Sequence, residues 1–394
     1  IYTLWHTLSL HDALPISFVF AAFTAYLPVL PIYLADLGAS NFQIGAVMSA
    51  FPVGVLLFRP VVSWMISNKT RKWTLIFGTT TLALSTALYL IFRDITLLMF
   101  VRLIHGTGLA AFTTAAIVII SDMTTSENRS EALGLIIAAN YVGFGLGPLF
   151  AGLLFQYTSI TSVFILALVL SSGSVLLSGL VQAQKEVHVT SQKAALSGFI
   201  NKRWFLVPLF YLLIVSFCHG GVIIFLPLHL RQFSNLNAGY FFLFFSIAVL
   251  FVRLGLGSVF DKFGRGITIF APSFIVIAAI YFIGQAPSLI ALVSAALLYG
   301  SGFGIQQPSM LAHIADNSTY TNRGAMFTVY YAIFDIGMLL SGYVFGAIAD
   351  RFSVDAIFTV AVFVYASGIF VFFMRNQSSI WHSIKWTLSL KKHA

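Results

Sequence analysis

The sequence predicts an all-α integral membrane protein with twelve transmembrane helices in two parallel repeats of six. Three observations support this fold class: the composition, a series of long apolar runs, and an internal repeat. Hydrophobic residues make up 59% of the 394 residues and charged residues only 8%, whereas soluble domains are about 45–50% apolar and about 25% charged. This composition excludes a soluble enzyme, a nucleic-acid-binding domain, a disulfide-rich secreted module and a disordered chain.

The first 16 residues differ from the rest of the chain. The stretch from His6 to Ile16 resembles the translation of a sequencing adapter. A signal peptide is the alternative, but the stretch lacks a basic start and contains Asp12. We therefore expect residues 1–16 to be a non-native segment and give them no functional role.

From Ser17 onwards, apolar runs long enough to cross a bilayer alternate with short polar breaks. The runs are continuously apolar rather than alternating, which excludes membrane strands. The predicted helix centres of the first half are near Phe23, Pro52, Leu82, Leu109, Val142 and Leu170, and those of the second half near Val215, Ala248, Ile275, Tyr299, Phe334 and Val362. The predicted parts are an N-terminal bundle at 17–181, a cytoplasmic linker at 182–203, a C-terminal bundle at 204–374 and a cytoplasmic tail at 375–394.

The basic residues predict the orientation in the membrane. Of 21 Lys and Arg residues, most fall in one set of loops and ends, which marks the cytoplasmic side. The other set of loops carries only Arg93, Arg231 and Arg351. Because the number of spans is even, both termini are expected on the cytoplasmic side. The membrane is expected to be the plasma membrane. These loops also account for the net charge of +9 without a nucleic-acid partner.

The second half repeats the first at a constant spacing of 194 residues. The spacing relates amide, basic and acidic residues as well as glycines, which argues against coincidence. Examples are Asn41 with Asn235, Arg59 with Arg253, Gly106 with Gly300, Asp122 with Asp316, and Gly143 with Gly337. Two similar six-helix halves can rock about a site at the membrane midplane.

Three motifs then resemble those of the major facilitator superfamily, over nearly the whole chain from Phe18. The loop motif between spans 8 and 9 comprises Gly257, Asp261, Lys262, Gly264 and Arg265, and Arg253 precedes it as a further gating candidate. Its counterpart between spans 2 and 3 runs from Arg59 to Arg71, with Ser67 where the family has Asp and Thr70 where it has Gly. The resemblance implies a gating role for these loops, in which a carboxylate latches the cytoplasmic side.

The motif in span 5 resembles that of proton-coupled antiporters. It comprises Gly134, Gly143, Gly147, Pro148 and Gly152, with Ala151 as the departure from the pattern. Small residues four apart form a flat face for close helix packing, and proline bends a helix. Close packing alone is the other interpretation. The direction of transport is implied by the resemblance only.

Ionisable groups inside the spans are candidates for proton coupling. Asp335 in span 11 is the only deep carboxylate. Arg102 begins the third motif that resembles those of the superfamily, which lies in span 4 and ends at Gly108. The alternatives are a permanent ion pair between these two residues or structural hydrogen bonds. His219 is a further candidate, although a lone histidine is more often structural, and His105 could orient Arg102.

Polar residues in the spans could line a substrate cavity. The candidates are Asn140, Tyr141, Gln306, Gln307, Tyr330 and Tyr331. For each, an interhelical hydrogen bond is the alternative. The single cysteine, Cys218, and the lack of metal-ligand spacing predict no metal and no cofactor. The resemblance implies the proton gradient as the energy source.

The resemblance implies a secondary active transporter that exports a small organic compound, either drug-like or a metabolite, in exchange for protons. It would contact membrane lipid and function as a monomer. An uptake symporter or uniporter on the same fold is the alternative, and a non-transporting membrane sensor or scaffold is the alternative of another class. An enzyme is not expected, because no nucleophile–base pair or metal set is visible.

Overall fold

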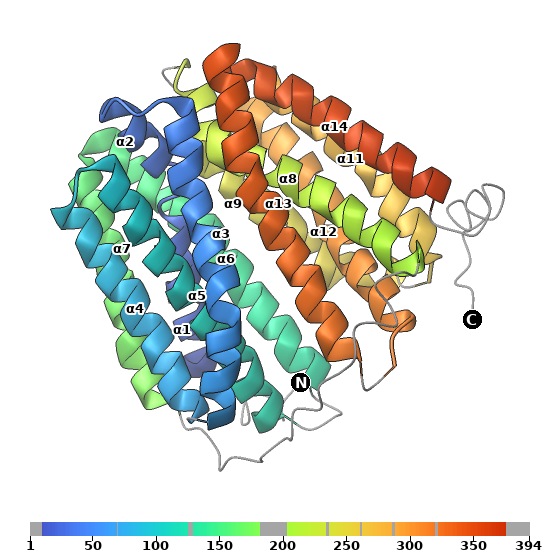
Figure 1. The fold of residues 1–394 in the computed structure, drawn as a ribbon, viewed down its shortest axis with the longest axis horizontal. Helices are drawn as coiled ribbons and strands as arrows, with labels where there is room; N and C mark the ends of the chain where they lie inside the picture. The colour runs from blue at the N-terminus through green and yellow to red at the C-terminus, as the bar shows by residue number, and fades with distance from the viewer. Residues whose placement is uncertain are drawn as a thin grey trace. The chain divides into compact units, whose positions relative to one another are not determined.

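The computed structural model describes residues 10–68, 70–124, 129–181, 203–233, 236–260, 262–285, 288–319 and 322–375. These residues are almost entirely helical, and no strand occurs among them. Every predicted span centre lies inside a helix, because apolar runs in lipid must satisfy their backbone hydrogen bonds locally. The all-α membrane fold is therefore confirmed (Figure 1).

The helices of the first half are α1 (Leu10–Thr24), α2 (Leu30–Asp36), α3 (Asn41–Asn68), α4 (Arg71–Ile91), α5 (Ile95–Met123), α6 (Arg129–Tyr157) and α7 (Ile160–Leu180). Those of the second half are α8 (Arg203–Leu230), α9 (Ala238–Phe251), α10 (Gly257–Phe260), α11 (Arg265–Gly284), α12 (Leu289–Asp316), α13 (Arg323–Arg351) and α14 (Val354–Arg375). A five-residue π-helical segment, η3 (Val252–Leu256), joins α9 to α10.

The first predicted span differs from the other eleven. Eleven helices of the described chain are long and apolar enough to cross a membrane, but the run around Phe23 is divided into α1 and α2 by a turn. Pro28 and Pro31 lie at this break, and proline has no backbone N–H to continue a helix. The first span is therefore formed by two short helices rather than one long helix.

The chain divides into two compact units. Unit 1 comprises Ile1–Val189 and Leu230–Leu243, and unit 2 comprises Thr190–His229 and Phe244–Ala394. The predicted linker lies almost wholly outside the described residues. The short segment 230–243, which we expected in the C-terminal bundle, groups with unit 1.

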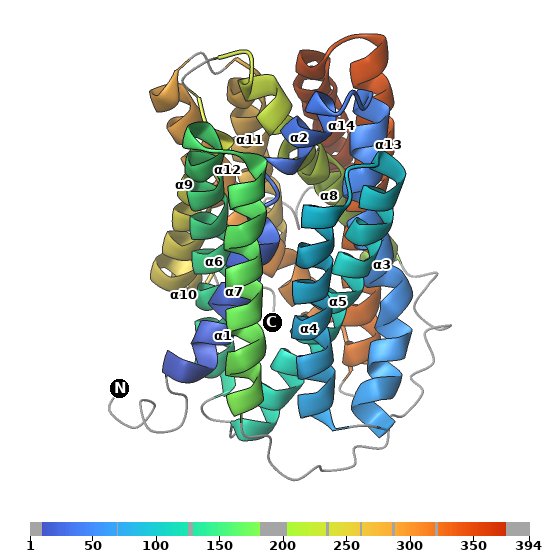
Figure 2. The same cartoon turned by 90° about the vertical axis from the view of Figure 1, so that its left-hand side faces the viewer.

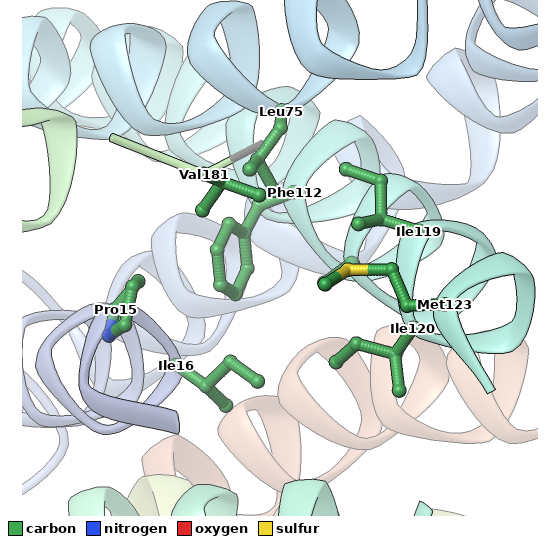
Figure 3. Close-up of a pocket in the computed structure, with 9 residues that line it drawn as sticks. Pro15, Ile16, Leu75, Phe112, Ile119, Ile120, Met123 and Val181 are labelled. Carbon is green, nitrogen blue, oxygen red and sulfur yellow. The ribbon is translucent and has the colours of Figure 1, made fainter. Parts of the chain in front are cut away.

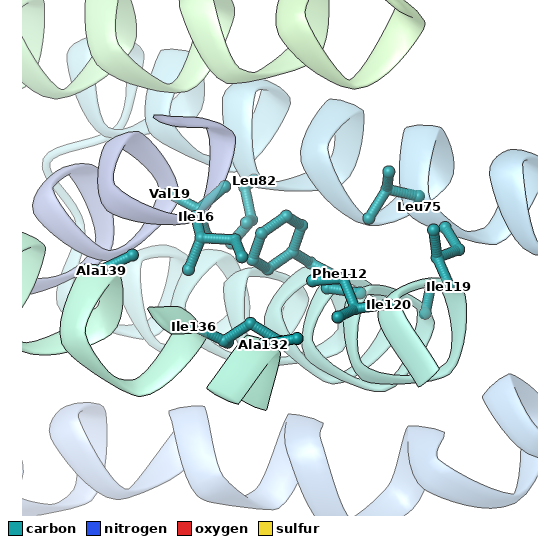
Figure 4. Close-up of a cluster of buried hydrophobic side chains, with 12 residues drawn as sticks. Ile16, Val19, Leu75, Leu82, Phe112, Ile119, Ile120, Ala132, Ile136 and Ala139 are labelled. Atoms are coloured by element: carbon teal, nitrogen blue, oxygen red, sulfur yellow. The ribbon is translucent and has the colours of Figure 1, made fainter. Parts of the chain in front are cut away.

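In unit 1, α5 packs against both α3 and α4, and α1 packs against α6 and α7 (Figure 2). Apolar side chains from α1, α4, α5 and α6 fill the space between these helices (Figure 4). The cluster includes Val19, Leu75, Leu82, Phe112 and Ile136. In unit 2, α11 packs against α12 and α14.

The repeat seen in the sequence also appears in the packing of each unit. A Cβ on Gly106 of α5 would collide with the carbonyl oxygen of Phe51 on α3. In unit 2, a Cβ on Gly300 of α12 would collide with the carbonyl oxygen of Phe245 on α9. Both members of the second pair lie 194 residues after those of the first. The spacing therefore preserves the same backbone-to-backbone contact in both units.

Candidate functional site

Arg102 and His105 lie in the interior of unit 1, on α5. Arg102 is 2% exposed, and its Cζ atom lies 4.8 Å from the ring centroid of Phe51 and 5.9 Å from that of Phe23. These distances are within the range of cation–π attraction. The ring of Phe51 also meets His105 edge to face, with centroids 5.7 Å apart. Arg102 is thus held by aromatic faces.

Two tyrosines that the sequence analysis did not select complete this cluster. Tyr26 follows α1 and Tyr89 lies on α4, with ring centroids 4.7 Å apart. The ring of Tyr26 lies 5.3 Å from that of His105 and 6.0 Å from the Cζ atom of Arg102. Tyrosine is common in membrane proteins, so only the packing distinguishes these two. We call Tyr26, Tyr89, Arg102 and His105 the α5 polar cluster.

In unit 2, His219 of α8 lies among aromatic residues. Its Nδ1 atom lies 3.0 Å from the hydroxyl of Tyr299 on α12, and its ring stacks on Phe303 with centroids 4.6 Å apart. The side chain is 6% exposed. His219 therefore has a hydrogen-bond partner and a packing role, which matches the structural alternative that the sequence left open.

Gln306 belongs to a hydrogen-bonded network that links four helices of unit 2. Its Nε2 atom donates to Tyr211 and Ser273, each at 2.8 Å, and its Oε1 atom accepts from Tyr365 at 2.8 Å. The side chain is 1% exposed. The structure thus places Gln306 in the interior of the bundle, in keeping with the interhelical hydrogen bond that was its alternative to cavity lining.

The neighbouring Gln307 faces a different set of residues. Its Oε1 atom accepts a 2.8 Å hydrogen bond from Arg253 in η3, and its backbone carbonyl accepts one of 3.3 Å from the hydroxyl of Tyr330. Tyr331 is 42% exposed and contacts Tyr330 edge to face. The structure therefore joins three residues that the sequence selected separately, and π-helical segments such as η3 often occur at functional sites.

Asp335 lies near the middle of α13 and is partly buried, as expected for a carboxylate placed inside a span. Asn140 and Tyr141 lie on α6 and are also partly buried. In the described part of unit 1, no carboxylate is seen to pair with Arg102. The roles of these residues in substrate binding and proton coupling stay predictions.

The two loop motifs take part in matching ion pairs. Arg71 at the start of α4 pairs with Asp122 near the end of α5, and Arg265 at the start of α11 pairs with Asp316 at the end of α12 at 2.9 Å. Asp261 lies outside the described residues. Ser67 donates to the carbonyl of Ser63 within its own helix, 3.0 Å away. The Ser67 hydroxyl is thus hydrogen-bonded within its own helix.

The other residues of the loop motifs lie on α3 or near the start of α10 and α11. Arg59 lies on α3 and is partly buried. Lys262 is exposed, and Gly264 is the residue that precedes α11. Gly257 opens α10, with open space where a Cβ would lie.

The glycines of the α6 motif fall into two groups. A Cβ on Gly143 or Gly147 would collide with backbone of α1, including the carbonyl oxygen of Ala21 beside Gly147. Gly152 lies against the side chain of Asn237, in the segment that groups with unit 1. A Cβ on Gly134 would meet nothing within 4 Å. Close packing therefore explains Gly143, Gly147 and Gly152, whereas Gly134 has no packing reason.

One small pocket in unit 1 lies between α1, α4 and α5 (Figure 3). Its lining is apolar and includes Leu75, Phe112 and Met123. Pro15 and Ile16, from the segment that resembles an adapter translation, also line it. We therefore assign no ligand to this pocket. No group of three or more potential metal ligands is found among the described residues.

Comparisons with known proteins agree with this architecture. The family model described as Major Facilitator Superfamily matches residues 14–321. An uncharacterized MFS-type transporter of Methanocaldococcus jannaschii is 21% identical, over 85% of this chain and 91% of its own length. The staphylopine export protein of Staphylococcus aureus is 23% identical, over 82% of this chain and 84% of its own.

A crystal structure of the nucleoside transporter NupG has the same fold. It superposes with a TM-score of 0.77 over 96% of this chain and 100% of its own, at 14% identity.

Proposed function

The chain belongs to the Major Facilitator Superfamily and is a multi-pass membrane transporter rather than an enzyme, and we propose that it exports a small organic compound in exchange for protons. The compound would be drug-like or a metabolite, and the two units would alternate its access to either side. We place the protein in the plasma membrane as a monomer, with both termini in the cytoplasm.

The glycine face of α6 is the observation that carries the export proposal. It resembles the motif of proton-coupled antiporters, and Gly143 and Gly147 lie so close to α1 that neither position accepts a side chain. Pro148 follows directly and bends or weakens the helix at that point. A tight but bendable helix contact is suited to sealing and opening a pathway. The export function of the staphylococcal relative supports the same direction.

Asp335 is the residue we propose for proton coupling, with Arg102 and His219 as further candidates. A partly buried carboxylate changes its charge when it binds a proton, and the two charge states favour different conformations. Proton entry would then drive substrate exit. Arg102 stays charged throughout, because a guanidinium does not lose its proton in proteins.

Transport by inside-out vesicles tests this proposal. With an imposed interior-acid pH gradient, a panel of neutral and amphipathic compounds, including fluorescent ethidium, should show uptake of at least one member that stops when the gradient is dissipated. Asp335→Asn should abolish gradient-driven uptake but leave exchange of the compound across the membrane. Unchanged gradient-driven uptake by this variant would exclude Asp335 from coupling.

The matched control is Asp94→Asn, which makes the same chemical change at an exposed position. Asp94 caps α5 by accepting from the backbone of Leu97 at 3.0 Å, and asparagine caps as well. This variant should transport as the unmodified protein does. Accumulation in right-side-out vesicles instead would indicate uptake, and the absence of any flux after reconstitution would indicate a sensor or scaffold.

A further inference from the structure

The α5 polar cluster carries a positive charge in the interior of unit 1 that no carboxylate of the described residues is seen to balance. Tyr26 is fully buried, and Tyr89, Arg102 and His105 are each at most 2% exposed. Within the described residues, three of their polar atoms are buried without a hydrogen-bond partner: Arg102 Nε, Arg102 Nη1 and His105 Nδ1. The hydroxyl of Tyr26 is near Thr86 and that of Tyr89 is near Arg102, but neither contact has the geometry of a full hydrogen bond. Buried polar groups in native proteins are nearly always paired, so this group of atoms requires an explanation.

The nearby carboxylates do not supply the missing counter-charge. In the described part of unit 1, Asp36 pairs with Arg231 at 2.5 Å, Asp94 caps α5, and Asp122 pairs with Arg71. Each of these acidic side chains is thus engaged outside the cluster. An unpaired charge removed from water strongly destabilises a folded protein. Cation–π contact with Phe51 offsets only part of this cost.

The interior of unit 2 shows that the fold does not require such a cluster. Alanine stands 194 residues after Arg102, at Ala296, and Tyr299 occupies the position that corresponds to His105. The polar residues of that interior form the neutral network around Gln306, in which the amide is bonded on both sides. The arginine at this position is therefore particular to unit 1.

The chemistry of the unpaired atoms is that of an anion site. The guanidinium nitrogens and the tyrosine hydroxyls are donors, and Nδ1 of histidine is a donor in one of its two neutral forms. The aromatic rings around them exclude water and strengthen charge interactions. The rings of Phe23, Phe51 and Phe164 surround the cluster on several sides. The site therefore suits a small ion better than an organic anion.

We propose that the α5 polar cluster binds a single small inorganic anion such as chloride. The anion balances the charge of Arg102 and accepts hydrogen bonds from the tyrosine hydroxyls. This inference is independent of the direction and coupling of transport, because it concerns binding within one unit and needs no gradient.

Chloride-dependent thermal stability of the purified protein in detergent tests the site. Unfolding can be followed with a thiol-reactive dye, because Cys218 is the only cysteine and is fully buried. Replacing sodium gluconate with sodium chloride at constant ionic strength should raise Tm and then reach a plateau, by an amount on the order of 5 °C. An equal Tm in both salts would overturn the proposal, with water as the occupant of the cluster.

Three variants make the test specific. Arg102→Met removes the charge and should abolish the chloride effect on Tm. Tyr89→Phe keeps the charge but removes one donor, and should raise the half-saturating chloride concentration roughly tenfold. Arg93→Gln, at an exposed arginine outside the cluster, should retain the full response. A chloride effect that survives Arg102→Met would overturn the proposal.

A binding measurement keeps the proposal testable if Arg102→Met does not fold. Equilibrium dialysis of the unmodified protein with radiolabelled chloride should find about one saturable ion per chain, and weaker binding for Tyr89→Phe. Absence of saturable binding would overturn the proposal.

Discussion

The Nε atom of Arg265 donates to the carboxylate of Asp316 at 2.9 Å, and the equivalent residues of unit 1, Arg71 and Asp122, form the same pair. In both units the arginine begins one helix and the aspartate lies at or near the end of the next long one. The pair thus connects the ends of two helices that also pack along their lengths. Its position in both loop motifs indicates a role shared by the units.

These pairs should contribute little to stability. The side chains of Arg265 and Asp316 are 13% and 45% exposed, and pairs open to water are worth about 0–1 kcal/mol. We expect a double-mutant cycle of Arg265→Gln and Asp316→Asn to give a coupling below about 1 kcal/mol in the free energy of unfolding. Raising the salt concentration should reduce that coupling further. A value of several kcal/mol would contradict this account.

Replacing Gly147 with alanine should damage the protein severely. The added methyl would collide with backbone of α1, so the two helices must separate. We expect a transport rate lowered at least tenfold and a free energy of unfolding lowered by about 1–3 kcal/mol, as in other overpacked sites. Vesicle transport and thermal unfolding measure the two effects.

The control for this variant is Gly173→Ala on α7, where a Cβ would meet nothing within 4 Å. Alanine is the better helix former by about 1 kcal/mol, so this variant should be as stable as the unmodified protein or slightly more so. If both alanine variants behave alike, close contact at α6 is not the reason for the glycine.

Removing one hydroxyl from the Gln306 network should destabilise unit 2. In Tyr365→Phe, the Oε1 atom of Gln306 loses its 2.8 Å donor in the interior. A buried polar atom left without a partner costs about 1–3 kcal/mol, and denaturant unfolding in detergent should show a loss of this size. Tyr281→Phe, at a 56% exposed position on α11, should change stability by less than about 0.5 kcal/mol.

The positions of the helices could be predicted from sequence because lipid allows few alternatives. The break between α1 and α2 was missed, although Pro28 and Pro31 mark it. In a long apolar run prolines are often tolerated, since neighbouring helices satisfy the freed groups. Sequence alone does not show whether a given proline bends a helix or ends it.

The interior polar residues were harder to predict, because their partners are far apart in the chain. Gln306 was selected as a cavity residue, but its partners come from three other helices, 33 to 95 residues away. The same holds for Tyr26 and Tyr89, which acquire meaning only beside Arg102. A polar residue in a span can be recognised from sequence, but its partner cannot.

The paired glycine contacts have a mechanical consequence for each unit. Where Gly106 meets the backbone of Phe51, and Gly300 that of Phe245, two helices touch main chain to main chain and cannot slide or bend separately. Such a helix pair moves as one rigid body. A unit can then bend only where the regular helical hydrogen bonding is already interrupted. Two such places are the turn between α1 and α2 and the π-helical segment η3, which contains Arg253.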